Sequence, residues 1–184
     1  MAGRRDEVVL AATFHQQMGT DPNTQGGSRR WIVRAVEDSL RRLGTDRIDL
    51  YQMHRPSTDC DIDETLAAIS DLVHAGKVLC LGSSTFPAAE MVEAQWAAER
   101  RGRERFVCEQ PPYSMLNRGI ERDVLPTCER YGMGVITWSP LGAGWPADGV
   151  EVARPSPVAA CRAFPRATTS RDRRTNASSR PPTR

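Results

Sequence analysis

The chain has 184 residues, enough for one domain with a sizeable core, and its net charge of +2 favours no particular class of partner. No apolar run approaches the roughly 18 residues of a membrane span, and the first residues lack the apolar core of a signal peptide. The five cysteines are widely spaced without a CxxC pair, which is typical of reduced thiols, so we expect a soluble, cytoplasmic protein with no membrane partner.

Short apolar segments recur along the chain at intervals of about thirty to forty residues. Each is bounded by polar or turn-forming residues and has the length of a buried strand. Segments with a helical period of apolar residues lie between them. The predicted strands cover residues 7–14, 48–53, 78–84, 105–110 and 134–139.

The helical segments carry recognisable start and stop signals. Ser28 is a plausible N-cap for the first helix, and Asp61 and Glu64 have capping-box spacing at the start of the second. Pro87 suits the first position of the third helix. Glycines follow the first three helices, as expected at helix C-termini. The predicted helices with their caps cover residues 28–44, 61–76, 87–102 and 124–131.

The alternation of strands and helices predicts βαβ units and a parallel sheet. Polar residues follow every predicted strand, where a (β/α)₈ barrel has its active site and where an open doubly wound sheet also binds ligands. Five units are too few for a complete barrel of roughly 250 residues. We therefore expect an α/β fold, a partial (β/α)₈ TIM barrel of about five βα units. The polar residues are Thr13, His15, His54, Ser83, Ser84, Thr85, Glu109, Gln110, Trp138 and Ser139.

The end of the chain differs from the rest in composition. Residues 151–184 carry eight arginines and two acidic residues, whereas residues 1–150 carry 17 basic and 21 acidic residues. A segment with few apolar residues and many Pro, Ser, Thr and Arg cannot bury enough apolar surface to offset the entropy lost when the chain becomes ordered. We expect a domain over residues 1–146 and a basic, disordered tail over 147–184. A nucleic-acid-binding arm is the less favoured interpretation of the tail, because no aromatic residues are interleaved, and nucleic acid is not an expected partner.

Two histidines and an acidic cluster each admit an ordinary structural interpretation. His54 is either a hydrogen-bonded residue at a strand end or a group placed to contact a reacting atom. His15 either borders a loop that covers a cofactor or is simply polar. The acidic run from Asp59 to Glu64 lacks the glycine and the later glutamate of a calcium loop, so a capped helix start explains it better and no metal is expected.

Several motifs, in order, resemble the aldo-keto reductase superfamily over residues 4–145: RIDLYQMHRP, GKVLCLGSSTF, CEQPPYSML and GVITWSPLGAG. They are most similar to the bacterial branch related to potassium-channel β subunits. The resemblance implies that the five strands correspond to barrel strands three to seven. It also implies NADPH as the cofactor and reduction of a small-molecule carbonyl substrate, an aldehyde or a ketone.

The resemblance further implies roles for individual residues. His54 corresponds to the histidine that hydrogen-bonds the substrate carbonyl, and Trp138 to the aromatic residue that stacks on the nicotinamide. The carboxamide would be held by Ser84, Thr85 and Gln110, although the family more often has Asn at the position of Thr85. The loop that contacts the pyrophosphate would contain Ser139, Leu141, Gly142 and Gly144.

The chain also departs from the family pattern. The motif that resembles LATKF reads LAATF, so Thr13 stands where the family has its catalytic lysine. The catalytic tyrosine and aspartate belong to strands without a counterpart here. We therefore expect an oxidoreductase with impaired turnover. The alternative is a catalytically inactive fragment, or a regulatory relative that binds nucleotide or a partner, as channel β subunits do. A complementing chain, or self-association through exposed sheet edges, is a further expectation.

Overall fold

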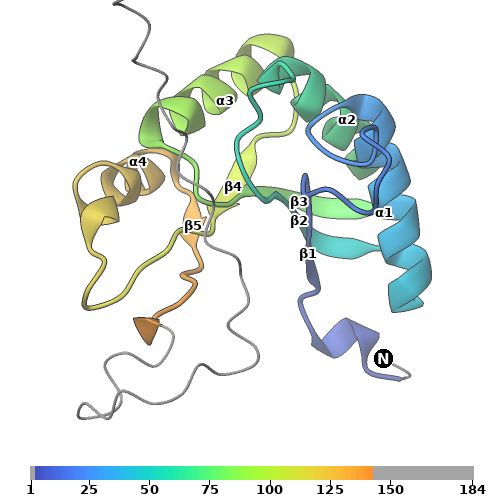
Figure 1. The fold of residues 1–184 in the computed structure, drawn as a ribbon, viewed down its shortest axis with the longest axis horizontal. Helices are drawn as coiled ribbons and strands as arrows, with labels where there is room; N and C mark the ends of the chain where they lie inside the picture. The colour runs from blue at the N-terminus through green and yellow to red at the C-terminus, as the bar shows by residue number, and fades with distance from the viewer. Residues whose placement is uncertain (1–2, 143–184) are drawn as a thin grey trace, which may run out of the picture. The chain divides into compact units, whose positions relative to one another are not determined.

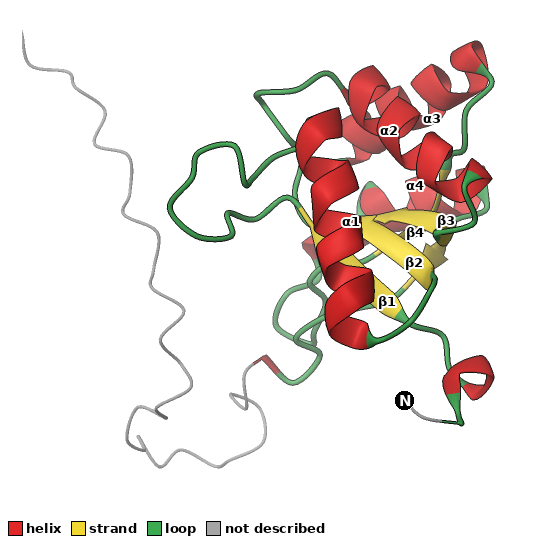
Figure 2. Cartoon of the chain, turned by 90° about the vertical axis from the view of Figure 1, so that its right-hand side faces the viewer, coloured by secondary structure: helices red, strands yellow, loops and turns green. Residues whose placement is uncertain are grey.

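The computed structural model describes residues 3–142, which lie within one compact unit. A parallel five-stranded sheet in the order β1-β2-β3-β4-β5 forms its centre. The helices α1 to α4 lie in an arc along one face of the sheet (Figures 1 and 2). The predicted α/β class is confirmed, with five strands and four helices in the described residues, and the arrangement is that of a partial (β/α)₈ barrel. The strands are β1 (Ala11–Phe14), β2 (Ile48–Met53), β3 (Val78–Ser83), β4 (Phe106–Glu109) and β5 (Gly134–Val135).

The helices begin and end close to their predicted signals. The Ser28 side chain accepts a hydrogen bond from the Trp31 backbone N–H, and Gly44 adopts the left-handed conformation after the first helix. Asp61 caps the second helix, but Glu64 does not complete a capping box because its Oε1 accepts from the Arg29 backbone N–H. No helix within residues 3–142 is long and apolar enough to cross a membrane. The helices are α1 (Arg29–Leu43), α2 (Ile62–His74), α3 (Ala88–Arg101) and α4 (Val124–Tyr131), with 3-10 turns at Arg5–Glu7 and Gly119–Glu121.

Pro87 and the two outer strands differ from the prediction. Pro87 is the N-cap of α3 rather than its first residue. The predicted strand over residues 7–14 starts only at Ala11, because the Leu10 backbone N–H is bound to the Asp49 carboxylate instead of a strand carbonyl. The strand predicted over 134–139 pairs regularly only at Gly134–Val135. The neighbouring strand β4 is followed by Pro111 and Pro112, which have no backbone N–H to donate. An isolated bridge between Pro112 and Trp138 follows.

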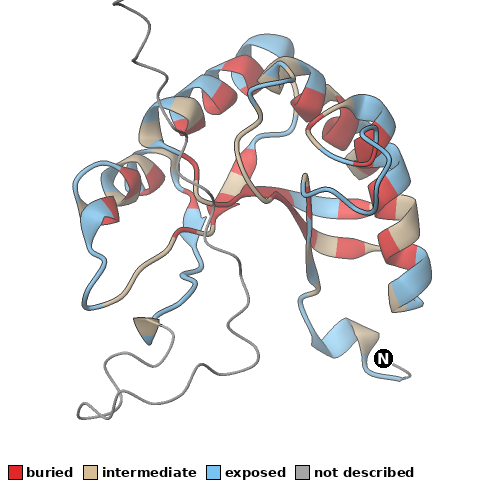
Figure 3. Cartoon of the chain, in the orientation of Figure 1, coloured by how far each residue is buried: buried red, intermediate tan, exposed pale blue. Residues whose placement is uncertain are grey.

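The hydrophobic core lies between the sheet and the helices (Figure 3). Phe14 and Tyr51 stack with ring centroids 4.9 Å apart, and Phe86 meets Phe106 edge-on at 5.7 Å. Apolar residues of all four helices belong to the same buried cluster as these rings, so the sheet and its helices bury one continuous core. This core fixes the strands side by side, and their carboxyl ends meet at one edge of the sheet.

Gly82 lies in a row of residues that runs across the sheet. The register pairs Gln52 with Gly82 and Gly82 with Cys108, and Cys108 in turn pairs with Gly134. A Cβ on Gly82 would meet Gln52 Cγ at 2.9 Å and the Cys108 carbonyl oxygen at 3.1 Å. Both distances are shorter than ordinary contacts, and one of the atoms is backbone that cannot turn away. The close approach of three strands therefore requires glycine here.

Replacing Gly82 with alanine is expected to lower the free energy of unfolding by about 1–3 kcal/mol, the usual cost of overpacking. Gly134→Ala is the matched control, because its new Cβ would meet only the Val107 carbonyl oxygen at 3.7 Å, an ordinary contact. Urea unfolding of both variants measures the difference. Equal stability of the two variants would show that β3 does not approach its neighbours as described.

Candidate functional site

The backbone joins three predicted site residues at the ends of β3 and β4. The Gln110 N–H donates to the Ser83 carbonyl at 2.8 Å, and the Thr85 N–H donates to the Gln110 carbonyl at 3.2 Å. The buried Ser84 hydroxyl donates to the same Gln110 carbonyl at 2.9 Å. One strand away, the His54 N–H donates to the Phe14 carbonyl at 3.0 Å. Ser84, Thr85 and Gln110 therefore form one connected unit, with His54 on the adjacent strand β2.

Within residues 3–142, three non-glycine residues have a positive φ, and each follows a strand at this edge. They are His15 with φ 109°, Thr85 with φ 59° and Ser139 with φ 55°. Such a conformation is uncommon for residues with a side chain, and it clusters at functional sites, where surrounding contacts stabilise it. The backbone thus departs from regular geometry at the edge that the sequence predicts to be functional.

A hydrogen-bonded network connects three strand ends through Arg55. The Arg55 Nη1 donates to the His54 carbonyl oxygen at 2.6 Å and to Thr85 Oγ1 at 3.0 Å. The indole Nε1 of Trp138 donates to the same Thr85 oxygen at 3.3 Å. The guanidinium also lies over the Trp138 ring, 5.9 Å from its centroid. The ends of β2 and β3 and the segment after β5 thereby converge on one hydroxyl group.

The pKa of each of the two histidines at this edge is lowered, which favours the neutral form of the imidazole. Burial lowers the pKa of His54, and the Arg55 charge lowers it further. Burial also lowers the pKa of His15, and the charges of His54 and Arg55 lower it further against the opposing effect of Asp59. A neutral imidazole can donate one hydrogen bond and accept another, which suits contact with a carbonyl oxygen.

A buried carboxyl group lies directly beneath the site. Glu109 is fully buried, accepts from the Ser83 hydroxyl at 2.5 Å and accepts from the Phe86 N–H at 3.2 Å. Burial raises the pKa of Glu109, and the Ser83 hydrogen bond opposes that change. The carboxyl group joins both sides of the segment that carries Ser84 and Thr85, so it fixes the course of the backbone there.

The predicted pyrophosphate loop is only partly connected to this cluster. Ser139 and Gly142 close a turn through a 2.9 Å hydrogen bond between the Gly142 N–H and the Ser139 carbonyl. Leu141 is exposed on the turn. Gly144 lies outside the described residues, so its predicted role stays a prediction. The turn adjoins Trp138 in sequence, but no hydrogen bond links its side chains to His54, Ser84 or Gln110 within residues 3–142.

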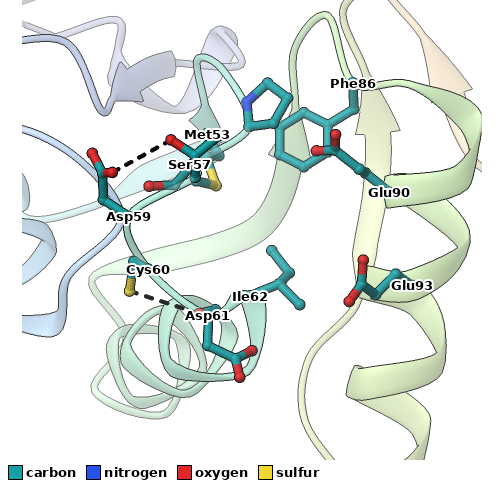
Figure 4. A pocket seen from close by; sticks show the side chains of 11 residues that line it. Met53, Ser57, Asp59, Cys60, Asp61, Ile62, Phe86, Glu90 and Glu93 are labelled. Carbon is teal, nitrogen blue, oxygen red and sulfur yellow. Dashed lines mark hydrogen bonds between the residues drawn. The ribbon is translucent and has the colours of Figure 1, made fainter.

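Residues at this edge also line hollows in the described part of the chain. One of ≈ 180 Å³ is lined by Thr13, His54 and residues of α1. A larger one of ≈ 540 Å³ lies between the loop after β2 and helix α3 (Figure 4). Its carboxylates would repel the phosphates of a dinucleotide, so it is a poor candidate for cofactor binding. They belong to Asp59, Asp61, Glu90 and Glu93.

The chain belongs to the aldo/keto reductase family, whose model matches residues 1–165. This match extends beyond the segment over which the motifs resemble the family. An uncharacterized oxidoreductase of Bacillus subtilis is 42% identical over 146 residues, covering 77% of this chain and 44% of the relative. An aldo-keto reductase of Alternaria alternata is 43% identical over 142 residues, 75% of this chain and 39% of the relative.

The relatives include proteins of a second kind. A protein of Arabidopsis thaliana named "Probable voltage-gated potassium channel subunit beta" is 35% identical over 142 residues, 77% of this chain and 43% of the relative. The chain thus spans less than half the length of these three relatives. The family and its branch are as the motifs predict.

Sequence reasoning missed two residues of the site. Arg55 has no predicted role beyond its place in the motif RIDLYQMHRP, yet it hydrogen-bonds Thr85 and lies over the ring of Trp138, 30 and 83 positions further along the chain. Glu109 was noted as a polar strand end without a role, although it is buried and hydrogen-bonded. The position of Arg55 directly after His54, at the carboxyl end of a buried strand, is the signal that could have indicated it.

Proposed function

We propose that the carboxyl edge of the sheet is the nicotinamide-binding part of an aldo-keto reductase that reduces aldehydes or ketones with NADPH. The observation that carries the proposal is the convergence of Thr85, Gln110 and Trp138 at one edge of the sheet. Membership of a family with oxidoreductase relatives supports it. A cytoplasmic location stays a prediction.

The proposed roles follow from the chemistry of each group. The bound cofactor would supply a hydride, and this chain's residues would orient its ring. Trp138, 37% exposed, offers an aromatic surface that shields one face of a nicotinamide. Gln110 and the hydroxyls of Ser84 and Thr85 would fix the carboxamide, so that one face of the ring points at the substrate. His54, neutral by burial, would donate a hydrogen bond to the substrate carbonyl oxygen.

The pyrophosphate of the cofactor would be bound by the loop that follows Trp138. The turn from Ser139 to Gly142 would place backbone N–H groups near the pyrophosphate, and Gly144 would extend this loop. Leu141 would contact the cofactor from the same loop. These assignments follow the family pattern, and no hydrogen bond within residues 3–142 links the turn to Ser84, Thr85 or Gln110.

A second candidate function is nucleotide or partner binding without turnover. Thr13 pairs with Gln52 at the site edge, where the family motif has a lysine, and a neutral hydroxyl cannot stabilise a tyrosinate as an ammonium does. The relative named as a channel β subunit also favours this candidate. The Thr13→Lys variant is expected to show no carbonyl reduction when assayed alone, because none of the three tyrosines is placed as a proton donor: Tyr51 is buried in the core, the Tyr113 hydroxyl donates to Glu121, and Tyr131 ends helix α4. NADPH oxidation by this variant would contradict that expectation.

A thermal melt with and without NADPH tests the proposal. A ligand at 100 times its Kd stabilises the native state by about 2.7 kcal/mol, so the melting temperature should rise by several degrees. Adenosine 2′,5′-bisphosphate, which has no nicotinamide, is the control and should have a smaller effect. A melting temperature that is unchanged by NADPH, or raised equally by both compounds, would contradict a nicotinamide site.

A further inference from the structure

Thr85 Oγ1 accepts two hydrogen bonds at once in this structure. One comes from Arg55 Nη1 at 3.0 Å and the other from Trp138 Nε1 at 3.3 Å. A hydroxyl oxygen has two lone pairs and one proton, so both acceptor positions are occupied. The Thr85 hydroxyl can therefore act toward a ligand only as a donor. Its preferred partner is a carbonyl oxygen, not an amide N–H.

Arg55 also contacts the indole ring of Trp138, which donates to the same Thr85 hydroxyl. Its guanidinium lies 5.9 Å from the Trp138 ring centroid, within the range of a cation–π contact. The same Nη1 is anchored to the His54 carbonyl oxygen at 2.6 Å, which fixes the side chain over the end of β2. Arg55 forms no ion pair with a carboxylate within residues 3–142, so these three contacts define its position.

We propose that Arg55 is a positioning residue for the cofactor. It fixes Thr85 as the hydrogen-bond donor to the carboxamide oxygen and holds the Trp138 ring beside it. The inference rests on the proposed NADPH site. The proposal also accounts for Thr85 at a position where the family more often has asparagine. An asparagine side chain has a separate NH₂ group that donates to the carboxamide oxygen. A threonine hydroxyl is both donor and acceptor, so its acceptor positions must be filled for its O–H to be directed at the ligand.

A double-mutant cycle on NADPH affinity tests the proposal. Arg55→Met is expected to raise the Kd about tenfold, because it removes a charged donor from the network. In the Thr85→Val background the same change should raise the Kd by a smaller factor, about threefold, since Arg55 then has no hydroxyl to direct and only its contact with the Trp138 ring is lost. Arg55→Lys, which keeps a charged donor, should restore part of the affinity. Arg100→Met is the matched control, because Arg100 lies over Trp96 on α3 at 4.9 Å, and it should leave the Kd unchanged.

A second readout requires no cofactor. The Trp138 indole N–H resonance, assigned by its loss in Trp138→Phe, should move in both Arg55→Met and Thr85→Val. Equal Kd changes in the two Thr85 backgrounds, or tighter binding by Arg55→Met, would overturn the proposal. Failure of the unaltered chain to bind NADPH would contradict the proposed function itself. In that case a shifted resonance still supports Arg55 as the residue that positions Thr85 and Trp138, and an unmoved one overturns it.

Discussion

Replacing Glu109 with alanine is expected to lower the free energy of unfolding by about 3 kcal/mol. The fully buried carboxyl group accepts from the Ser83 hydroxyl and the Phe86 N–H. Its removal leaves both donors without a partner in the interior, at roughly 1–3 kcal/mol for each unpaired group, and also opens a cavity. Urea unfolding measures the loss. A change of less than 1 kcal/mol would show that Glu109 does not hold the segment beneath the site.

Glu109→Gln is the matched control, because it keeps the side-chain volume and one acceptor oxygen. It also gives a pH test. Burial raises the pKa of Glu109 above the ordinary value of 4.5, so between 4.5 and the raised pKa the folded chain binds a proton that the unfolded chain has lost. The native state is therefore favoured at low pH, and this contribution declines as pH rises through the raised pKa. The Gln variant should gain stability relative to the unaltered chain as pH rises from 4.5 through the raised pKa. A constant difference would contradict the raised pKa.

Replacing Trp138 with alanine is expected to weaken NADPH binding roughly 30-fold. Stacking of a planar ring on an aromatic side chain contributes about 1–3 kcal/mol. The same substitution removes the indole N–H that donates to Thr85. Titration calorimetry with NADPH measures the change in Kd. Trp96→Ala serves as the control, because Trp96 is exposed on α3 and belongs to no contact of the site.

The two tryptophan variants together separate a local effect from a general one. If both weaken binding equally, loss of stability rather than loss of stacking is responsible. If neither does, the cofactor does not stack on Trp138, and the assignment of this residue is wrong. Only a loss confined to Trp138→Ala supports the proposed site.

Much of the fold could be predicted because its signals are local. Helix caps such as Ser28 and Gly44 act within one or two turns, and alternation of strands with helices leaves a parallel sheet as the favoured arrangement. The strand ends were less predictable because they depend on distant partners. The Asp49 carboxylate takes the Leu10 N–H, which shortens β1, and two prolines after β4 interrupt its pairing with the last strand.

The candidate site could be predicted as a set of strand ends but not as a network. The resemblance pointed to Thr85 and Trp138, yet nothing in the sequence joins them through Arg55, since that contact depends on how three strand ends converge. The positive φ of Thr85 and the burial of Glu109 likewise arise from tertiary packing. They become visible only when the carboxyl edge of the sheet is assembled.

An NMR titration of the chain with NADPH tests the central claim most directly, because it locates the binding site as well as detecting binding. We expect the largest backbone shifts at His54, Ser84, Thr85, Gln110 and Trp138, with little change around the acidic hollow beside α3. Shifts centred on that hollow, or no shifts at saturating NADPH, would contradict a nicotinamide site at the carboxyl edge of the sheet.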